Sequence, residues 1–63
     1  MFEVNDLLKL KNSHDDTIYV IYKKKYNTSG SVIRYWLRNL YSNYNIIRNI
    51  PEHILKSVYD KVI

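Results

Sequence analysis

The clearest strand signal in the chain is an apolar alternation over residues 17–26. Successive strand side chains point to opposite faces, so the two predicted faces carry Ile18, Val20 and Tyr22, and Thr17, Tyr19 and Ile21. β-branched and aromatic residues dominate the stretch, as is typical of strands. An unbroken alternation puts Lys24 on the face of Ile18, and puts Lys23 and Lys25 on the face of Tyr19.

The clearest helix signal lies in residues 29–44, where apolar positions recur at spacings of three and four. The apolar stripe consists of Val32, Ile33, Trp36, Leu37, Leu40, Tyr41 and Tyr44. Asn, Thr and Ser residues before the stripe are suitable N-caps. Trp36 lies in the middle of the stripe and is expected in the core. Arg34, Tyr35 and Arg38 would lie on the opposite, outer face.

A second helix is predicted from about Pro51 to Val62. Proline suits the first helical turn, and Glu52 suits the positive end of the helix dipole. Residues 43–50 before it fit either a short strand or an extended connector.

The N-terminal residues 2–11 alternate well enough for a strand, but a short helix capped by Asn5 is the alternative. The polar loop at residues 12–16 could join such a strand to residues 17–26 as an antiparallel hairpin, which we favour. The predicted fold is therefore α+β: one small domain over residues 1–63, with an antiparallel β-hairpin packed on a long amphipathic helix plus a C-terminal helix. The alternative is a mostly α fold with one strand or a short ribbon.

Charge is unevenly distributed in this 63-residue chain, whose formal net charge is +4. No acidic residue occurs between Thr17 and Pro51, whereas that segment contains Lys23, Lys24, Lys25, Arg34, Arg38 and Arg48. An uncompensated basic segment is typical of a surface that meets an anionic partner. The alternative is a basic face that only keeps the protein soluble.

The sequence shows no pattern that fixes a catalytic chemistry. A single glycine excludes a glycine-rich cofactor loop, and the absence of cysteine excludes thiolate metal sites. The cluster of His14, Asp15 and Asp16 is interpreted as a turn whose side chains bond to the local backbone. We therefore expect no enzyme, no cofactor and no metal site.

The remaining interpretation is a small, non-catalytic binding protein that binds an anionic macromolecule, with nucleic acid favoured. The expected binding residues share a basic or tyrosine side chain in the segment free of acidic residues, and are Lys23, Lys24, Lys25, Tyr26, Arg34, Tyr35, Arg38 and Arg48. The alternative is an inhibitor or regulator that docks on an acidic protein, an enzyme or a nucleoprotein complex. Homodimer formation is compatible with both.

Location is inferred only from general features of the chain. No apolar run approaches the roughly 18 residues of a membrane span, and the N-terminus lacks a signal-peptide pattern. We expect a soluble cytoplasmic protein without a membrane partner. The abundance of Asn, Lys, Ile and Tyr, which have AT-rich codons, hints at a virus or another mobile element, in which case the location is the host cell.

Overall fold

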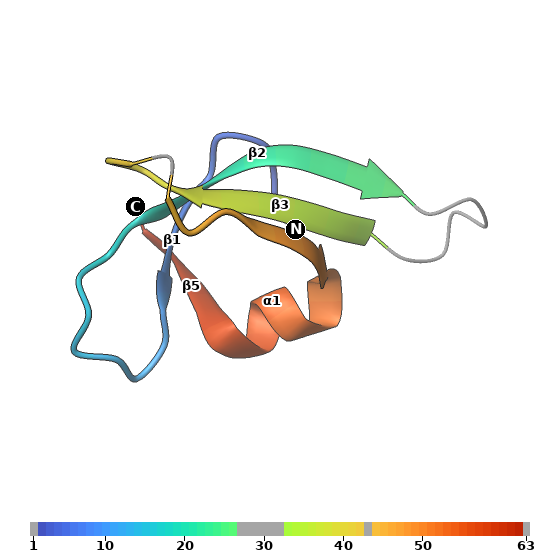
Figure 1. Cartoon of the computed structure of the whole chain (residues 1–63). Helices are drawn as coiled ribbons and strands as arrows, with labels where there is room; N and C mark the ends of the chain where they lie inside the picture. Colours follow the sequence, from blue (N-terminus) through green and yellow to red (C-terminus); the bar gives the residue numbers. More distant parts are fainter. Residues whose placement is uncertain (1, 27–32, 43, 63) are drawn as a thin grey trace.

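The computed structural model describes residues 2–26, 33–42 and 44–62, and shows one curled antiparallel sheet with a short helix (Figure 1). The elements are β1 (Leu7–Leu10), β2 (Tyr19–Tyr26), β3 (Ile33–Asn39), β4 (Ile47–Pro51), α1 (Glu52–Val58) and β5 (Tyr59–Val62). The strand order is β4-β3-β2-β1-β5. Consecutive strands from β1 to β4 are therefore neighbours, and β5 returns to the outer edge of β1.

The predicted α+β fold is wrong, and so is its mostly α alternative, because the described chain is mainly sheet. In place of the long helix at residues 29–44, β3 runs from Ile33 to Asn39, and residues 29–32 and 43 lie outside the described residues. Ile33, Tyr35 and Leu37 also alternate with a period of two, and pairing with β2 and β4 satisfies the backbone on both sides. The stripe's last residues, Tyr41 and Tyr44, are 82% and 81% exposed.

The predicted C-terminal helix is right at its start and wrong in its second half. α1 begins directly after Pro51, with Glu52 in its first turn, but it ends at Val58. Residues 59–62 form β5, which pairs antiparallel with β1. The free edge of β1 needs a backbone partner, and Tyr59 is buried in the strand conformation.

The antiparallel hairpin at the N-terminal side is confirmed. β1 pairs with β2 so that Leu7 faces Val20 and Leu8 faces Tyr19. Residues 2–11 contain the predicted strand rather than the alternative helix, although the strand is limited to Leu7–Leu10. The undecided residues 43–50 contribute most of β4.

The core lies inside the curl of the sheet, where α1 closes one side (Figure 1). Its buried side chains come from the N-terminal segment, from β1, β2, β3 and β5, and from the helix, and are Phe2, Leu8, Tyr19, Ile21, Tyr35, Leu37, Leu55 and Tyr59. Two edge-to-face aromatic pairs fill much of it, with ring centroids 5.9 Å apart for Phe2 and Tyr35 and 5.7 Å apart for Tyr19 and Tyr59. Because the inner face of the sheet surrounds this cluster, the outer face is convex.

Two irregularities in strand pairing decide which side chains reach that outer face. In β2, Ile21 pairs with Leu37 and Lys23 pairs with Trp36, so Tyr22 is an extra residue. In β4, Ile47 and Ile50 both pack against the core although they are three residues apart, and Arg48 and Asn49 together oppose Trp36. A bulge of this kind reverses the alternation beyond it. Both bulges lie beside the same residue of β3.

Asparagine occupies the left-handed backbone positions of the described chain. The non-glycine residues with positive φ are Asn5, Asn12, Asn45 and Asn49, with φ of 78°, 53°, 60° and 58°. Asparagine tolerates this conformation better than most residues because its short side chain can bond locally. In a chain with one glycine, asparagine therefore supplies the tight turns and the β4 bulge.

Candidate functional site

The outer face of β2, β3 and β4 collects five of the ten Lys and Arg side chains of the chain. Arg34, Trp36 and Arg38 alternate along β3 with the core residues Tyr35 and Leu37, so the three share the outer face. Lys25 pairs with Arg34, Lys23 pairs with Trp36, and the β4 bulge brings Arg48 opposite Trp36. We call this set the basic face, and its members are Lys23, Lys25, Arg34, Trp36, Arg38 and Arg48.

Trp36 lies at the centre of the basic face and not in the core, which corrects the expectation from the helical stripe. It is half-buried and does not belong to the core cluster. The Nζ atom of Lys23 lies 4.9 Å from the centroid of its ring, within the range of a cation–π contact. The indole therefore has one cation against its ring, and part of it stays accessible.

The two arginines of β3 are half-buried and anchored to the backbone. Arg34 Nη1 donates to the carbonyl oxygen of Asn49 at 3.2 Å, and Arg38 Nη1 donates to that of Asn39 at 3.3 Å. A guanidinium has five N–H donors, so each of these bonds leaves others for a ligand. The anchoring lowers the entropy that these side chains lose on binding.

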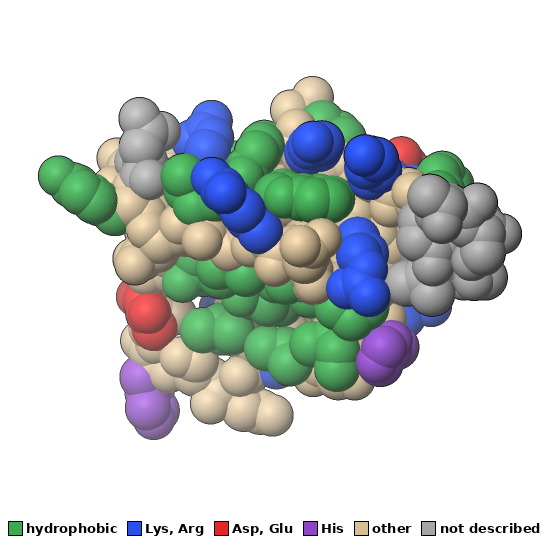
Figure 2. Space-filling model, turned by 45° about the vertical axis from the view of Figure 1, so that its right-hand side comes forward, with side chains coloured by type: hydrophobic (Ala, Val, Ile, Leu, Met, Phe, Trp, Pro, Cys, Tyr) green, Lys and Arg blue, Asp and Glu red, His purple; other side chains and the backbone are tan. Residues whose placement is uncertain are grey.

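The described residues place no carboxylate in an ion pair with the basic face. The ion pairs of the described chain lie elsewhere and are Lys11–Asp60, Lys24–Glu3, Lys56–Glu52 and Lys61–Asp6. Within residues 2–26, 33–42 and 44–62, no cation of the basic face has an ion-pair partner. In Figure 2, Lys and Arg side chains gather on the upper part of the molecule with hydrophobic ones between them, and acidic side chains lie at the margins.

Three expected binding residues, Lys24, Tyr26 and Tyr35, lie on the inner side of the sheet. Beyond the bulge at Tyr22, Lys24 pairs with Tyr35 and shares its face, so Lys24 is not on the face predicted from an unbroken alternation. Lys24 Nζ donates to the Phe2 carbonyl oxygen at 3.2 Å and to Glu3 Oε1 at 3.2 Å. Tyr35 is fully buried, in contrast to the outer position that a helix implied.

Two exposed tyrosines of β2 lie near the site. Tyr26 was an expected binding residue, and Tyr22 was not. Tyr26 is 54% exposed at the end of β2 and pairs with Ile33, which packs against the core, so Tyr26 is not on the basic face. Tyr22, the bulge residue, is 38% exposed and follows the core residue Ile21. Sequence reasoning missed Tyr22 and Trp36 as surface residues. The pattern of Arg34, Trp36 and Arg38 at every second position was the available signal.

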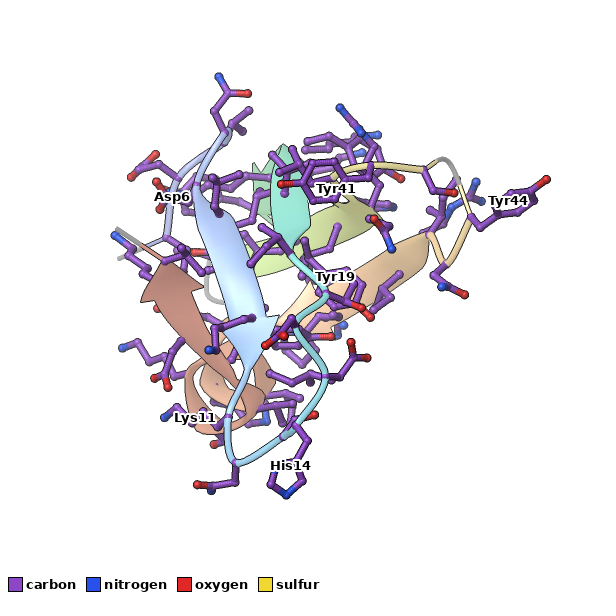
Figure 3. The ribbon with its side chains drawn as sticks, turned by 90° about the vertical axis from the view of Figure 1, so that its left-hand side faces the viewer. Asp6, Lys11, His14, Tyr19, Tyr41 and Tyr44 are labelled. Carbon is purple, nitrogen blue, oxygen red and sulfur yellow. The ribbon has the colours of Figure 1, made fainter. Side chains whose placement is uncertain are left out.

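The loop between β1 and β2 forms the turn predicted around Asp15. Asp15 Oδ1 accepts hydrogen bonds from the backbone N–H of Thr17 at 2.9 Å and from its hydroxyl, and the Asp15 N–H donates to Ser13 Oγ at 3.0 Å. These hydrogen bonds from the hydroxyl and backbone N–H of Thr17 lower the pKa of the Asp15 carboxyl. His14 extends outward from this loop, and Tyr44 extends outward from the turn before β4 (Figure 3).

Metal-binding side-chain clusters and membrane-spanning helices are both absent from the described residues. They include no group of three or more His, Cys, Asp or Glu side chains placed to hold a metal ion. The same described ranges contain no helix long and apolar enough to cross a membrane.

Comparison with known proteins leaves the interpretation to the site itself. No protein-family model matches the chain, and neither a curated protein nor a solved structure shows significant similarity to it.

Proposed function

We propose that this chain is a non-catalytic binding protein that binds nucleic acid through the basic face. One observation carries the proposal: Lys23, Lys25, Arg34, Arg38 and Arg48 share one side of the sheet around Trp36, and the described residues provide these cations with no carboxylate partner. Such a surface suits a polyanion, because bringing phosphates to it relieves the repulsion among its own charges.

The side chains of the basic face match the two chemical parts of a nucleic acid. Lysine and arginine neutralise phosphates and release the counterions that surround them. Arginine also binds phosphate oxygens in a bidentate manner, and the backbone anchors of Arg34 and Arg38 fix where these contacts form. The indole of Trp36 adds a flat apolar surface for a base or sugar. These are contacts for binding, and the proposal requires no chemical step.

The test is the salt dependence of binding to a labelled mixed-sequence oligonucleotide, measured by fluorescence anisotropy. Five phosphate contacts predict that the logarithm of the binding constant falls with the logarithm of salt concentration with a slope of about −3.5 for a single strand. The slope would be steeper for a duplex. The double variant Arg34→Gln with Arg38→Gln removes two cations, so the slope should fall to about −2.1. Glutamine can still donate a hydrogen bond to the backbone, which favours retention of the fold.

A matched control removes the same charge from elsewhere in the molecule. Lys9 is exposed on β1, and Lys56 lies on α1, paired with Glu52 at 3.8 Å. The double variant Lys9→Gln with Lys56→Gln therefore changes net charge equally but leaves the basic face intact. Equal losses of affinity in both double variants would contradict a localised site. No binding at any salt concentration would refute the proposal and redirect the search to an acidic protein partner.

A further inference from the structure

We infer that the basic face binds single-stranded rather than double-stranded nucleic acid, with an unpaired base stacked on Trp36. The inference rests on the proposed function and names the class of ligand that this site takes. It is carried by the position of the indole, the width of the face and the two bulges beside Trp36.

The position of Trp36 is suited to stacking. It lies between Arg34 and Arg38 on the same face of β3, each two residues and so about 7 Å along the strand from it. Lys23 and Arg48 lie opposite it on the neighbouring strands. Lys23 Nζ lies over one face of the ring, so a base would stack on the other face or displace this ammonium, and Arg34, Arg38 and Arg48 would remain for its flanking phosphates. A duplex cannot use this arrangement, because its bases are already stacked on one another.

The shape of the face disfavours a duplex groove. β2, β3 and β4 are paired side by side across the region of Trp36, so the outer strands are about 10 Å apart before side chains are counted. The major groove of B-DNA is only about 12 Å wide and admits one helix or a two-stranded ribbon. α1, the helix of the described chain, packs on the core side of the sheet (Figure 1). A convex three-stranded face instead lets a flexible single strand follow its surface.

The bulges add side chains beside the indole that a regular sheet would not present. In β2, Tyr22 and Lys23 both lie between the core-facing residues Ile21 and Lys24. In β4, Arg48 and Asn49 likewise lie between the core-packing residues Ile47 and Ile50, where a regular strand would have one outward residue. Tyr22 offers a second ring for stacking, and the Asn49 amide offers a donor and an acceptor for a base edge. The face is thus equipped for unpaired bases as well as for phosphates.

The experiment compares four ligands of equal strand length with the full chain at physiological salt. They are oligo-dT, oligo-U, an abasic DNA strand that has the same phosphates without bases, and a DNA duplex. We expect dT and U strands to bind more tightly than both the abasic strand and the duplex. The chain has one tryptophan, so Trp36 fluorescence should be quenched by the two base-containing single strands and not by the abasic strand.

The decisive variant is Trp36→Leu, with Tyr44→Leu as a matched control because Tyr44 is 81% exposed and outside the basic face. Loss of one stacked base corresponds to a decrease in affinity of about 5- to 150-fold. The ratio of dT to abasic affinity should fall by this factor in Trp36→Leu and stay unchanged in Tyr44→Leu. Circular dichroism checks folding, and Trp36→Phe, which keeps an aromatic ring, should restore part of the ratio.

The outcomes separate this inference from the proposed function. If the abasic strand or the duplex binds as tightly as dT, or if dT does not quench Trp36 fluorescence, the basic face binds phosphates but the single-strand inference is wrong. If no ligand binds, both are wrong. Oligo-dT and oligo-U differ both in the 2′-hydroxyl and in the C5-methyl group of the base, and a preference for either strand supports the inference.

Discussion

The hydroxyl of Tyr35 donates a 2.6 Å hydrogen bond to Glu52 Oε2, which joins the middle of β3 to the first turn of α1. The same hydroxyl lies 3.4 Å from the carbonyl oxygen of Phe2, which also accepts a bond from Lys24. Tyr35 is fully buried and its ring packs edge-on against Phe2. One side chain thus connects the N-terminal segment, the sheet and the helix, and holds the inner side of the sheet that carries the basic face on its outside.

Replacing Tyr35 with phenylalanine should destabilise the domain. The variant keeps the ring but removes a hydrogen bond to a carboxylate, a change of about 2 kcal/mol in the free energy of unfolding. Urea denaturation followed by Trp36 fluorescence measures the loss. Tyr22→Phe is the matched control, because Tyr22 is 38% exposed and should tolerate the change. An unchanged urea midpoint for Tyr35→Phe would show that the bond adds nothing to stability.

Stability should decrease in alkaline solution because of the same residue. Burial and the nearby Glu52 carboxylate raise the pKa of Tyr35, and burial raises the pKa of Tyr59. The hydroxyl of an unfolded tyrosine titrates at about pH 10. Below that pH both states hold the proton and the stabilisation is present in full. Above it the unfolded chain loses protons that the folded chain retains, so stability falls as pH rises.

Urea midpoints measured between about pH 8 and 11 test this expectation. Lysines also lose charge in that range, so the wild-type curve alone is not sufficient. Tyr35→Phe provides the comparison, because it lacks one of the two perturbed hydroxyls and should show a shallower decrease. Parallel curves for the two proteins would mean that Tyr35 does not contribute to the pH dependence.

The neighbours Lys23 and Lys24 should behave in opposite ways when replaced by alanine. Lys23 belongs to the basic face, so Lys23→Ala should lower the salt slope of single-strand binding by about 0.7 with little effect on stability. Lys24 contacts Phe2 and Glu3 on the inner side, and its side chain is 12% exposed. Lys24→Ala should destabilise the domain by about 1 kcal/mol and leave affinity intact.

Anisotropy and urea denaturation of both lysine variants give the comparison directly. If the two variants lose affinity equally, the assignment of their side chains to opposite faces is incorrect for binding.

The β4 bulge should depend on the backbone conformation of Asn49. Its φ of 58° suits glycine and asparagine but is strained for a β-branched residue. Asn49→Val should destabilise the domain by about 1–2 kcal/mol, whereas Asn49→Gly should be close to neutral. Arg48→Val is the control at the adjacent position, which does not have positive φ. Thermal unfolding compares the three, and equal melting temperatures for Asn49→Val and Asn49→Gly would contradict the proposed constraint.

The sequence by itself determined the features that depend on local order. The alternation at residues 17–26 predicted β2, and the position of Pro51 predicted where α1 begins. The lack of acidic residues from Thr17 to Pro51 predicted a concentration of positive charge in the middle of the chain. These results required no knowledge of neighbouring strands, because backbone preference and residue order are sufficient for them.

Only the tertiary structure decided that residues 33–39 form a strand and not a helix. It also decided on which face of the sheet the side chains of β2 and β4 lie. Residues 33–39 satisfy both a helical and a strand period, and backbone pairing with β2 and β4 selects the strand. One extra residue at Tyr22 moves Lys24 to the inner side, and a second bulge at Asn49 turns Arg48 outward. A bulge exists only relative to a paired strand, so periodicity within one segment cannot reveal it. Trp36 is therefore a surface residue because of its partners in the sheet.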